Sequence, residues 1–485
     1  MKIIKDVEFT DEIIRKIFGS YDGEGEDIER LKEYYFKTDT YNSIIADIPV
    51  RILVGSKGVG KSALFRISMN EQKEKKMFPI LIKPDDIAEI GEKHESLILS
   101  IRKWKFGLID IIVKKVLDEF GISNEGVTGK IIKSGGKIIP LIQEIINQPT
   151  NLTNVNRERK QLINNFKATR KIIVYLDDLD RGWQNRKNDL IMISALINSI
   201  RDLASENDGL QFKLALRLDV YNSVRTEDES SDKFEGLVIW HFYSFNEIFG
   251  MLVKRVITYF GESFDETTLL KKEQHELASN LDPIFEKTFH IEGKIGKISM
   301  HRALLSLIRN RPRDLVKLCA MSAKKARNEN SAKINSSHIL DAMPNFSRSL
   351  INDTLAEYKS ELPQIERLIY GMKPNRSEGR TGDSFCFTTS ELNTKIYKII
   401  QQGQFVFASG NTATVDELCE FLFRINFIVA KKRLENGSIV RKTYEHESHL
   451  SSKYIKAGYE WEILLPYRWA IQPESLDDII QRIPD

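Results

Sequence analysis

The stretch RILVGSKGVGKSALF, residues 51–65, carries the strongest indication of fold in the chain. Residues 51–54 read as a buried strand, and residues 55–62 match the pattern G-x-x-x-x-G-K-[S/T] at the point where the strand gives way to a helix. Glycines at these positions let several backbone N–H groups face one point, where the helix N-terminus adds partial positive charge. We therefore expect a loop that holds a phosphate group between a strand and a helix.

Two side chains of this loop suit a nucleoside triphosphate and its metal. Lys61 is predicted to reach the β- and γ-phosphates of ATP, and the Ser62 hydroxyl to take one coordination position on Mg²⁺. The alternative is a glycine-rich turn that binds no nucleotide, which the strand before it and the helix after it disfavour. The residues predicted to contact the nucleotide are Gly55, Ser56, Lys57, Gly58, Val59, Gly60, Lys61, Ser62 and Ala63.

A second stretch, YLDDLDRGW at residues 175–183, ends another apolar run in three carboxylates. Burying carboxylates is costly unless a cation pairs with them. We expect this strand to lie beside the strand of the phosphate-binding loop, so that Asp177 binds Mg²⁺ and Asp178 orients the attacking water. Alternatively, Asp178 and Asp180 cap the following helix. Arg181 either pairs with Asp180 or projects to the nucleotide of a neighbouring subunit.

Two arginines are candidates for sensing the γ-phosphate. The run at residues 212–216 ends in Arg217-Leu218-Asp219, at the tip of a strand expected beside the acid-bearing one. Farther on, Pro312 opens a helix in RNRPRDLVKLC, residues 309–319, and Arg313 stands in its first turn, where cations are disfavoured unless an anion binds. We predict Arg217 as a first sensor and Arg313 as a second. The alternatives are an arginine paired with Asp219 and plain surface charge.

Composition limits the class of protein. A chain of 485 residues, 41% of them hydrophobic, can form several globular units, and its net charge of +3 means that any nucleic-acid-binding surface must be local. The three cysteines form no CxxC pair, which disfavours both a disulfide framework and a zinc site. No window approaches the roughly 18 apolar residues that span a bilayer, and the N-terminus is unlike a signal peptide. We expect a cytoplasmic protein that enters no membrane.

The order of the patterns predicts the domain organisation. Apolar runs at residues 51–54, 78–82, 172–176, 212–216 and 237–240 alternate with amphipathic helices, which is typical of a parallel α/β sheet. The expected parts are an N-terminal helical segment at 1–50, an ATPase core at 51–260 with a Lys-rich helical insertion at about 93–170, a strand-free helical lid at 261–345, and a winged-helix-like domain at 346–485.

The last of these parts suggests where a partner binds. Residues 361–371, 388–401 and 414–426 are predicted helices, and residues 427–446 alternate around Asn436-Gly437, a strong hairpin signal. A basic wing would suit a phosphate backbone, although acids on the third helix disfavour major-groove reading. A charged edge strand facing water is the alternative. The basic residues of the predicted wing are Lys431, Lys432, Arg433, Arg441 and Lys442.

The motifs together resemble those of AAA+-related bacterial ATPases of the STAND and KAP-like groups. They are GSKGVGKSA at 55–63, LDDLDR at 176–181 and RPRDL at 311–315, preceded by the segment YFKTDTY at 35–41. The resemblance implies an α/β fold with a P-loop NTPase parallel sheet of the additional-strand type, a helical insertion, an α-helical lid and a C-terminal winged-helix domain. It implies the same roles for the residues named above. Asp178 stands where many AAA+ members have glutamate.

Two functions from different classes agree with these features. In the first, ATP binding and hydrolysis switch the chain between states, promote self-association and control a separate effector protein, and family analogy suggests bacterial antiphage defence as the setting. In the second, the chain is a DNA-handling ATPase that resembles origin-recognition proteins, with the basic wing and the Lys-rich insertion gripping DNA.

Overall fold

The structure is a computed structural model, and the chain in it divides into two compact units. The sheet unit is Lys37–His241, and the composite unit joins Met1–Phe36 to Phe242–Asp485. The structure describes residues 7–20, 25–88, 90, 96–124, 127–134, 136–148, 156–181, 183–227, 232–262, 266–290, 297–374, 384–435, 438–447, 450 and 458–471.

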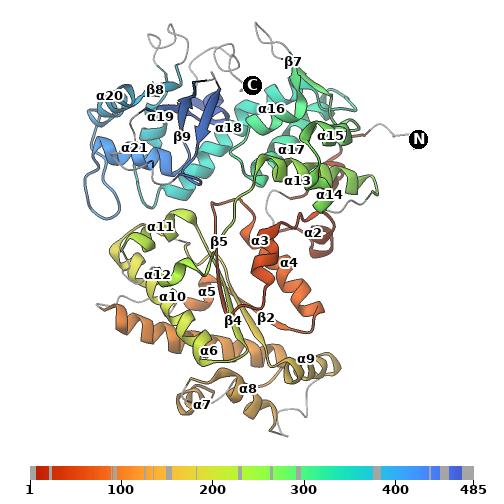
Figure 1. The fold of residues 1–485 in the computed structure, drawn as a ribbon, viewed down its shortest axis with the longest axis vertical. Helices are drawn as coiled ribbons and strands as arrows, with labels where there is room; N and C mark the ends of the chain where they lie inside the picture. The colour runs from red at the N-terminus through yellow and green to blue at the C-terminus, as the bar shows by residue number, and fades with distance from the viewer. Residues whose placement is uncertain are drawn as a thin grey trace. The chain divides into compact units, whose positions relative to one another are not determined.

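The sheet unit contains a parallel sheet in the order β2-β3-β4-β1-β5 (Figure 1). Its strands nearly coincide with the five predicted runs. They are β1 (Val50–Val54), β2 (Phe78–Ile82), β3 (Ile172–Leu176), β4 (Leu210–Leu216) and β5 (Val238–Trp240). The expectation that the acid-bearing strand lies beside the strand of the phosphate-binding loop is wrong, because β4 pairs with both β1 and β3 and separates them. This order is that of the additional-strand type of P-loop fold.

Helices cover both faces of this sheet. The helices α3 (Asp39–Ile45) and α4 (Lys61–Glu74) lie on one side, and α10 (Lys187–Glu206) lies on the other (Figure 1). The contact of α4 with β3 is specific, since the Ser68 and Tyr175 hydroxyl oxygens lie 2.6 Å apart and the Phe65 and Tyr175 rings meet edge to face. Residues of β3 and β4 are all buried, which explains why these strands are continuous apolar runs.

The predicted helical insertion lies between β2 and β3. It contains α5 (Pro84–Ile87), α6 (Leu97–Phe120), α7 (Val127–Lys133), α8 (Ile138–Ile146) and α9 (Arg157–Thr169). The rings of Phe78, Phe120 and Phe166 join β2, α6 and α9, with ring centroids 5.0–6.4 Å apart. After β4 come α11 (Leu218–Glu227) and α12 (Asp232–Glu235).

A buried lysine lies near the N-terminal edge of the sheet. Lys213 on β4 is 1% exposed and donates from Nζ to the carbonyl oxygens of Ala46 and Ile48, each at 3.1 Å. Burial lowers the pKa of Lys213 to about 8. The lysine therefore fixes the segment that leads from α3 into β1.

The composite unit brings together two distant parts of the chain. The N-terminal helices α1 (Asp11–Phe18) and α2 (Ile28–Tyr34) pack with α13 (Phe245–Tyr259), and α1 also packs with α17 (Pro312–Asn328). The predicted N-terminal segment is therefore divided, since α3 belongs to the sheet unit. Other elements of this part are α14 (Glu266–Lys271), α15 (Gln274–Ala278), η2 (Ser279–Leu281), α16 (Met300–Ser306) and α18 (Ser336–Tyr358).

Two details of the expected lid differ from the structure. The expectation of a lid without strands is wrong, because β6 (Thr288–His290) and β7 (Lys297–Ser299) form an antiparallel pair. Strands of three residues are too short to produce a periodic signal. The expected limit at residue 345 falls inside α18, which continues past Pro344.

The C-terminal part contains a four-stranded antiparallel sheet in the order β10-β9-β11-β8. The three predicted helices are present in shorter form, and β9 and β10 pair as the predicted hairpin, whose turn Asn436-Gly437 lies outside the described residues. The elements are α19 (Ile365–Gly371), β8 (Cys386–Thr388), α20 (Thr389–Ile400), α21 (Val415–Arg424), β9 (Ile428–Arg433), β10 (Ile439–Lys442), β11 (Glu460–Ile463) and α22 (Leu465–Ile471). Among the described residues, no helix has the length and apolar character needed to cross a bilayer.

Candidate nucleotide-binding site

The loop between β1 and α4 has the backbone that its glycines predict. Gly58 and Gly60 have φ of 83° and 97°, in the left-handed region, and Gly60 is the N-cap of α4. A Cβ at Gly55 would lie 2.7 Å from the backbone oxygen of His241, so a larger residue does not fit there. The loop therefore presents the N-terminus of α4 as a cradle of the kind that binds phosphate groups.

Lys61 is the first residue of α4 and folds back over the loop. Its Nζ donates to the carbonyl oxygens of Gly55 at 2.7 Å and Ser56 at 3.2 Å. The predicted phosphate-binding ammonium group thus lies at the loop itself. The next residue, Ser62, forms a side-chain hydrogen bond with Asp177.

Asp177 directly follows β3 and is half-buried. Burial raises the pKa of its carboxyl, while the hydrogen bond from Ser62 and the charge of Lys61 act in the opposite direction. The structure therefore brings Lys61, Ser62 and Asp177 together although β4 separates their strands. A hydroxyl and a carboxylate are oxygen ligands of the kind that Mg²⁺ prefers.

No described group of three or more His, Cys, Asp or Glu residues could hold a metal ion. A site for Mg²⁺ at Ser62 and Asp177 would therefore draw its other ligands from nucleotide phosphates and water, as Mg²⁺ does in other proteins.

Asp178 follows in a left-handed conformation with φ of 61°. Its backbone N–H donates to Asp177 Oδ1 at 3.0 Å, and its exposed carboxylate lies 3.3 Å from Nε of Arg181. Arg181 therefore pairs with Asp178, and the expectation that it pairs with Asp180 is wrong. The alternative capping role is also wrong for both aspartates, because α10 begins at Lys187.

Asp180 is buried behind this turn. Its Oδ2 accepts a hydrogen bond from the backbone N–H of Arg217 at 2.9 Å, which joins the turn after β3 to the tip of β4. Burial raises the pKa of Asp180, and the positive charges of Lys61 and Arg217 act against that rise. Asp180 is thus a member of the site whose role the sequence left open.

The side chain of Arg217 is held by Asp219, which it contacts through Nε at 3.1 Å and through a terminal nitrogen at 2.5 Å. This is the pairing of the alternative prediction, but the arginine is not a surface residue, since its side chain is only 14% exposed. β4 does lie next to β3, as expected. The tip of β4 therefore stands between the loop and the acids, and the sensor role of Arg217 stays a prediction.

His241 is a member of the site that the sequence analysis missed. It follows β5, is fully buried, and donates its backbone N–H to the carbonyl oxygen of Val54 at 2.7 Å. Burial and the nearby charge of Lys61 lower the pKa of His241 to about 3, so the ring is neutral near pH 7. Asp177 and Arg217 were predicted as site residues because each is the first polar residue after an apolar strand. His241 has the same position after β5, so the same rule could have found it.

Arg313 belongs to the composite unit, so the sheet unit alone does not contain it. It is half-buried in the first turn of α17. In the same motif Arg309 and Asp314 form a buried ion pair with nitrogen–oxygen distances of 2.7 and 2.9 Å. The motif RNRPRDL thus includes a structural ion pair, and Arg313 as a second sensor stays a prediction.

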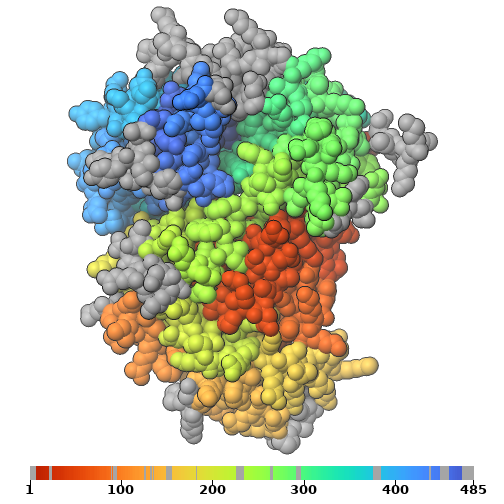
Figure 2. All heavy atoms as spheres, in the orientation of Figure 1, coloured from red at the N-terminus to blue at the C-terminus, as the bar shows by residue number. Residues whose placement is uncertain are grey.

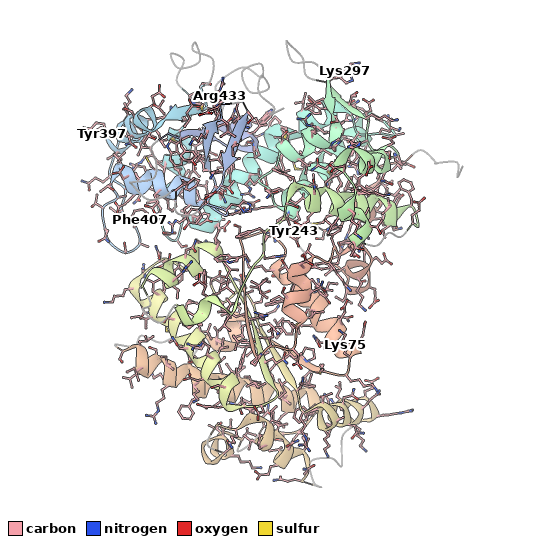
Figure 3. All side chains as sticks on the ribbon, viewed as in Figure 1. Lys75, Tyr243, Lys297, Tyr397, Phe407 and Arg433 are labelled. Carbon is pink, nitrogen blue, oxygen red and sulfur yellow. The ribbon has the colours of Figure 1, made fainter. Side chains whose placement is uncertain are left out.

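Several basic residues of the predicted wing have acidic partners in the structure. Lys431 is buried and lies 3.7 Å from Glu460, Arg441 is 2.8 Å from Glu462, and Lys442 is 2.7 Å from Glu447. The expectation of a five-residue basic face is therefore wrong, because three of its members are paired with acids. Lys432 and Arg433 remain exposed at the end of β9, where Arg433 is labelled in Figure 3.

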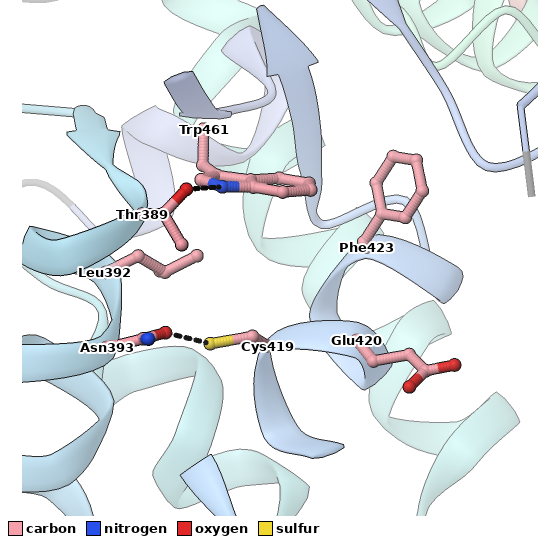
Figure 4. Close-up of a pocket in the computed structure, with 7 residues that line it drawn as sticks. All are labelled: Thr389, Leu392, Asn393, Cys419, Glu420, Phe423 and Trp461. Carbon is pink, nitrogen blue, oxygen red and sulfur yellow. Dashed lines mark hydrogen bonds between the residues drawn. The ribbon is translucent and has the colours of Figure 1, made fainter. Parts of the chain in front are cut away.

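A small pocket lies between α20, α21 and β11 (Figure 4). Trp461 Nε1 donates to Thr389 at 3.0 Å, and the Cys419 thiol donates to Asn393 at 3.2 Å. Its volume of 10 Å³ is about that of one water-sized probe, too small for an organic ligand. The residues that line it are Thr389, Leu392, Asn393, Cys419, Glu420, Phe423 and Trp461.

Comparisons with known proteins locate one family and one relative. Residues 265–355 match the FunZ-associated C-terminal helical domain, a segment that runs from α14 into α18. The putative transposon gamma-delta 80.3 kDa protein of Escherichia coli strain K12 is 22% identical over 375 residues, which cover 70% of this chain and 51% of that protein. The chain thus spans about half the length of this curated relative.

Three solved structures align with most of this chain at low identity. A Walker-type ATPase of Pyrococcus abyssi aligns with a TM-score of 0.40 and 13% identity, covering 84% of this chain and 94% of that one. The Aeropyrum pernix ORC2 protein gives 0.35 and 11%, with 86% and 89% covered. The Aeropyrum pernix ORC1 protein in complex with DNA gives 0.34 and 12%, with 94% and 96% covered.

Proposed function

We propose that the chain binds ATP with Mg²⁺ at the loop of residues 55–63 and hydrolyses it. The observation that carries this proposal is the meeting of Lys61, Ser62 and Asp177 at the C-terminal ends of strands that are not neighbours. Parallel sheets of this order place a ligand at that edge. A half-buried aspartate beside a loop serine and a loop lysine is the arrangement that a bound metal–phosphate group requires.

Each residue has one proposed task. The loop N–H groups and Lys61 hold the β- and γ-phosphates, and Ser62 and Asp177 hold Mg²⁺, which neutralises charge on the phosphate oxygens when it is bound. Asp178 orients and deprotonates the attacking water. Arg217 and Arg313 are proposed to respond to the γ-phosphate.

The switch hypothesis concerns the consequence of binding. We infer that ATP binding changes the state of the chain, promotes self-association and thereby controls a separate effector protein, with Arg181 as a candidate for contact with a neighbouring nucleotide. Bacterial antiphage defence is the setting that the family resemblance suggests. A DNA-handling role through the wing has less support, because the acids described above pair with most of its cations.

The test is ATP binding by Lys61→Ala, measured by calorimetry in the presence of Mg²⁺. We expect binding too weak to detect, because the ammonium group that faces the phosphates is lost. Lys103→Ala removes an exposed lysine of α6 and serves as the matched control. Unchanged affinity in Lys61→Ala would refute the assignment of the loop. Measuring the mass of the wild-type particle with and without ATP tests self-association separately.

A further inference from the structure

The N-terminal edge of the parallel sheet carries a concentration of positive charge. Residues 73–76, at the end of α4, and residues 157–171, which include α9, contain nine basic and two acidic residues, a net charge of +7, and one of these basic residues, Lys171, pairs with Asp47 at 2.5 Å. The whole chain has a net charge of only +3. This is therefore the local basic surface that the composition alone could not locate.

The register of the sheet brings the two segments together. Phe78 of β2 pairs with Ile172 of β3, so Lys76 and Arg170, each two residues earlier, enter neighbouring strands side by side. Both have left-handed backbone, with φ of 61° and 52°. The backbones of neighbouring strands lie about 4.8 Å apart, so the two cations add to the positive charge of one region, where like charges repel each other. The C-terminal dipoles of α4 and α9 offset part of that repulsion.

The helix dipole does not stabilise the cations at the N-terminal end of α9. Arg157 and Lys160 stand in the first turn of α9, where the dipole disfavours cations. With Lys167 they are exposed, beside the buried stripe of Ile163 and Phe166. None of the three forms an ion pair with any residue that the structure describes. Between Arg157 and Lys167 the charges extend over about 15 Å of helix.

The end of α4, where Lys75 is labelled in Figure 3, and α9 adjoin on the face shown in Figure 2. No exposed large hydrophobic side chain lies on the described residues of either segment. A surface that inserts into lipid would need such side chains. The nucleotide site lies at the opposite edge of the sheet, about 17 Å away along a five-residue strand.

We propose that this basic edge binds the phosphate backbone of duplex nucleic acid, without reading its sequence. Its members are Lys75, Lys76, Arg157, Lys160, Lys167 and Arg170. Regularly spaced, unpaired cations on one helix face match the dense negative charge of a duplex, which supplies the affinity of sequence-independent binding. The inference does not rest on ATP binding, since none of its residues belongs to the nucleotide site.

The experiment measures binding of the full chain to a fluorescently labelled DNA duplex by anisotropy at several salt concentrations. Lys160→Glu/Lys167→Glu is expected to bind at least about tenfold more weakly, and the slope of log K against log salt to shrink by about 0.9 for each phosphate that the variant no longer neutralises. The matched control Lys103→Glu/Lys187→Glu makes the same charge change at exposed positions elsewhere in the sheet unit and is expected to bind like wild type.

Three results would overturn the proposal. They are wild-type affinity in Lys160→Glu/Lys167→Glu, loss of binding only in the wing variant Lys432→Glu/Arg433→Glu, and binding of the wild type to anionic vesicles but not to the duplex. Circular dichroism and the thermal unfolding midpoint of each variant, compared with wild type, verify its fold. If Lys160→Glu/Lys167→Glu fails that check, the neutral variant Lys160→Gln/Lys167→Gln replaces it, with a smaller but measurable loss expected.

Discussion

Replacing Asp180 with asparagine separates the buried charge of the site from its hydrogen bond. The amide oxygen of the substituted side chain can still accept from the backbone N–H of Arg217, whereas the negative charge beside Lys61 disappears. The pKa of Asp180 is raised in the folded protein from its ordinary value of 3.8. Its contribution to stability is therefore present below pH 3.8 and is lost as the pH rises through the folded pKa.

At neutral pH the Asp180 carboxylate is thus a net cost to folding. We expect Asp180→Asn to unfold at higher urea concentration than wild type at pH 7 and to differ little from it near pH 3. Asp180→Ala, which removes the acceptor as well, leaves the N–H of Arg217 without its partner at a cost of about 1–3 kcal/mol. The alanine variant should therefore be less stable than the asparagine variant by about that amount.

Urea unfolding at the two pH values checks this reasoning. It is refuted if Asp180→Asn is as unstable as Asp180→Ala at pH 7, because the charge would then stabilise the fold. Phosphate release by the same variants locates the general base. Asp178→Asn is expected to retain ATP and lose about 10²–10⁴-fold in hydrolysis. If Asp180→Asn loses hydrolysis and Asp178→Asn does not, orienting the water is the task of Asp180.

Three further substitutions test other parts of the structure. The free energy of unfolding of the wild type should rise between pH 8 and 10.5, because folded Lys213 loses a proton that the unfolded chain keeps. Lys213→Met should flatten that rise in urea unfolding across this range, and identical pH profiles of stability for the variant and the wild type would contradict this. Gly55→Ala should weaken ATP binding about tenfold or more by calorimetry, because its Cβ meets the backbone of His241, and unchanged affinity would show that the loop can yield. Asp314→Asn leaves Arg309 charged and buried, so thermal unfolding should show a loss of about 3–5 kcal/mol, and a loss of only about 0–1 kcal/mol would place the pair among surface ion pairs.

The patterns in the sequence predicted the parts of the site that follow directly from strands and turns. The glycine-rich pattern predicted a loop between a strand and a helix, in which Gly58 and Gly60 have left-handed backbone, and the apolar runs predicted the strands that end just before Gly55 and Asp177. These predictions succeeded because each depends on a short segment. A left-handed turn requires glycine at particular positions, and a buried strand requires a run of apolar residues, so both can be recognised from residues that are adjacent in the chain.

The errors concern residues whose partners lie far away in the chain. Sequence could not show that β4 separates β1 from β3, nor that Glu460 and Glu462 of β11 would approach the basic residues of β9 and β10. Asp180 stayed undecided for the same reason, since its partner Arg217 lies on another strand.

Local patterns were enough to specify the sheet strands, the glycine-rich loop after β1 and the acids after β3, because backbone preferences and apolar periodicity act on short segments. Which charges acquire a partner depends on contacts between segments that are distant in the chain. The tertiary structure paired Lys431, Arg441 and Lys442 with acids, and it brought the lysines that follow α4 close to the cations of α9 at one edge of the sheet. The physical reason is that an ion pair depends on a separation of a few ångströms in space, and only the register and order of the strands set that separation.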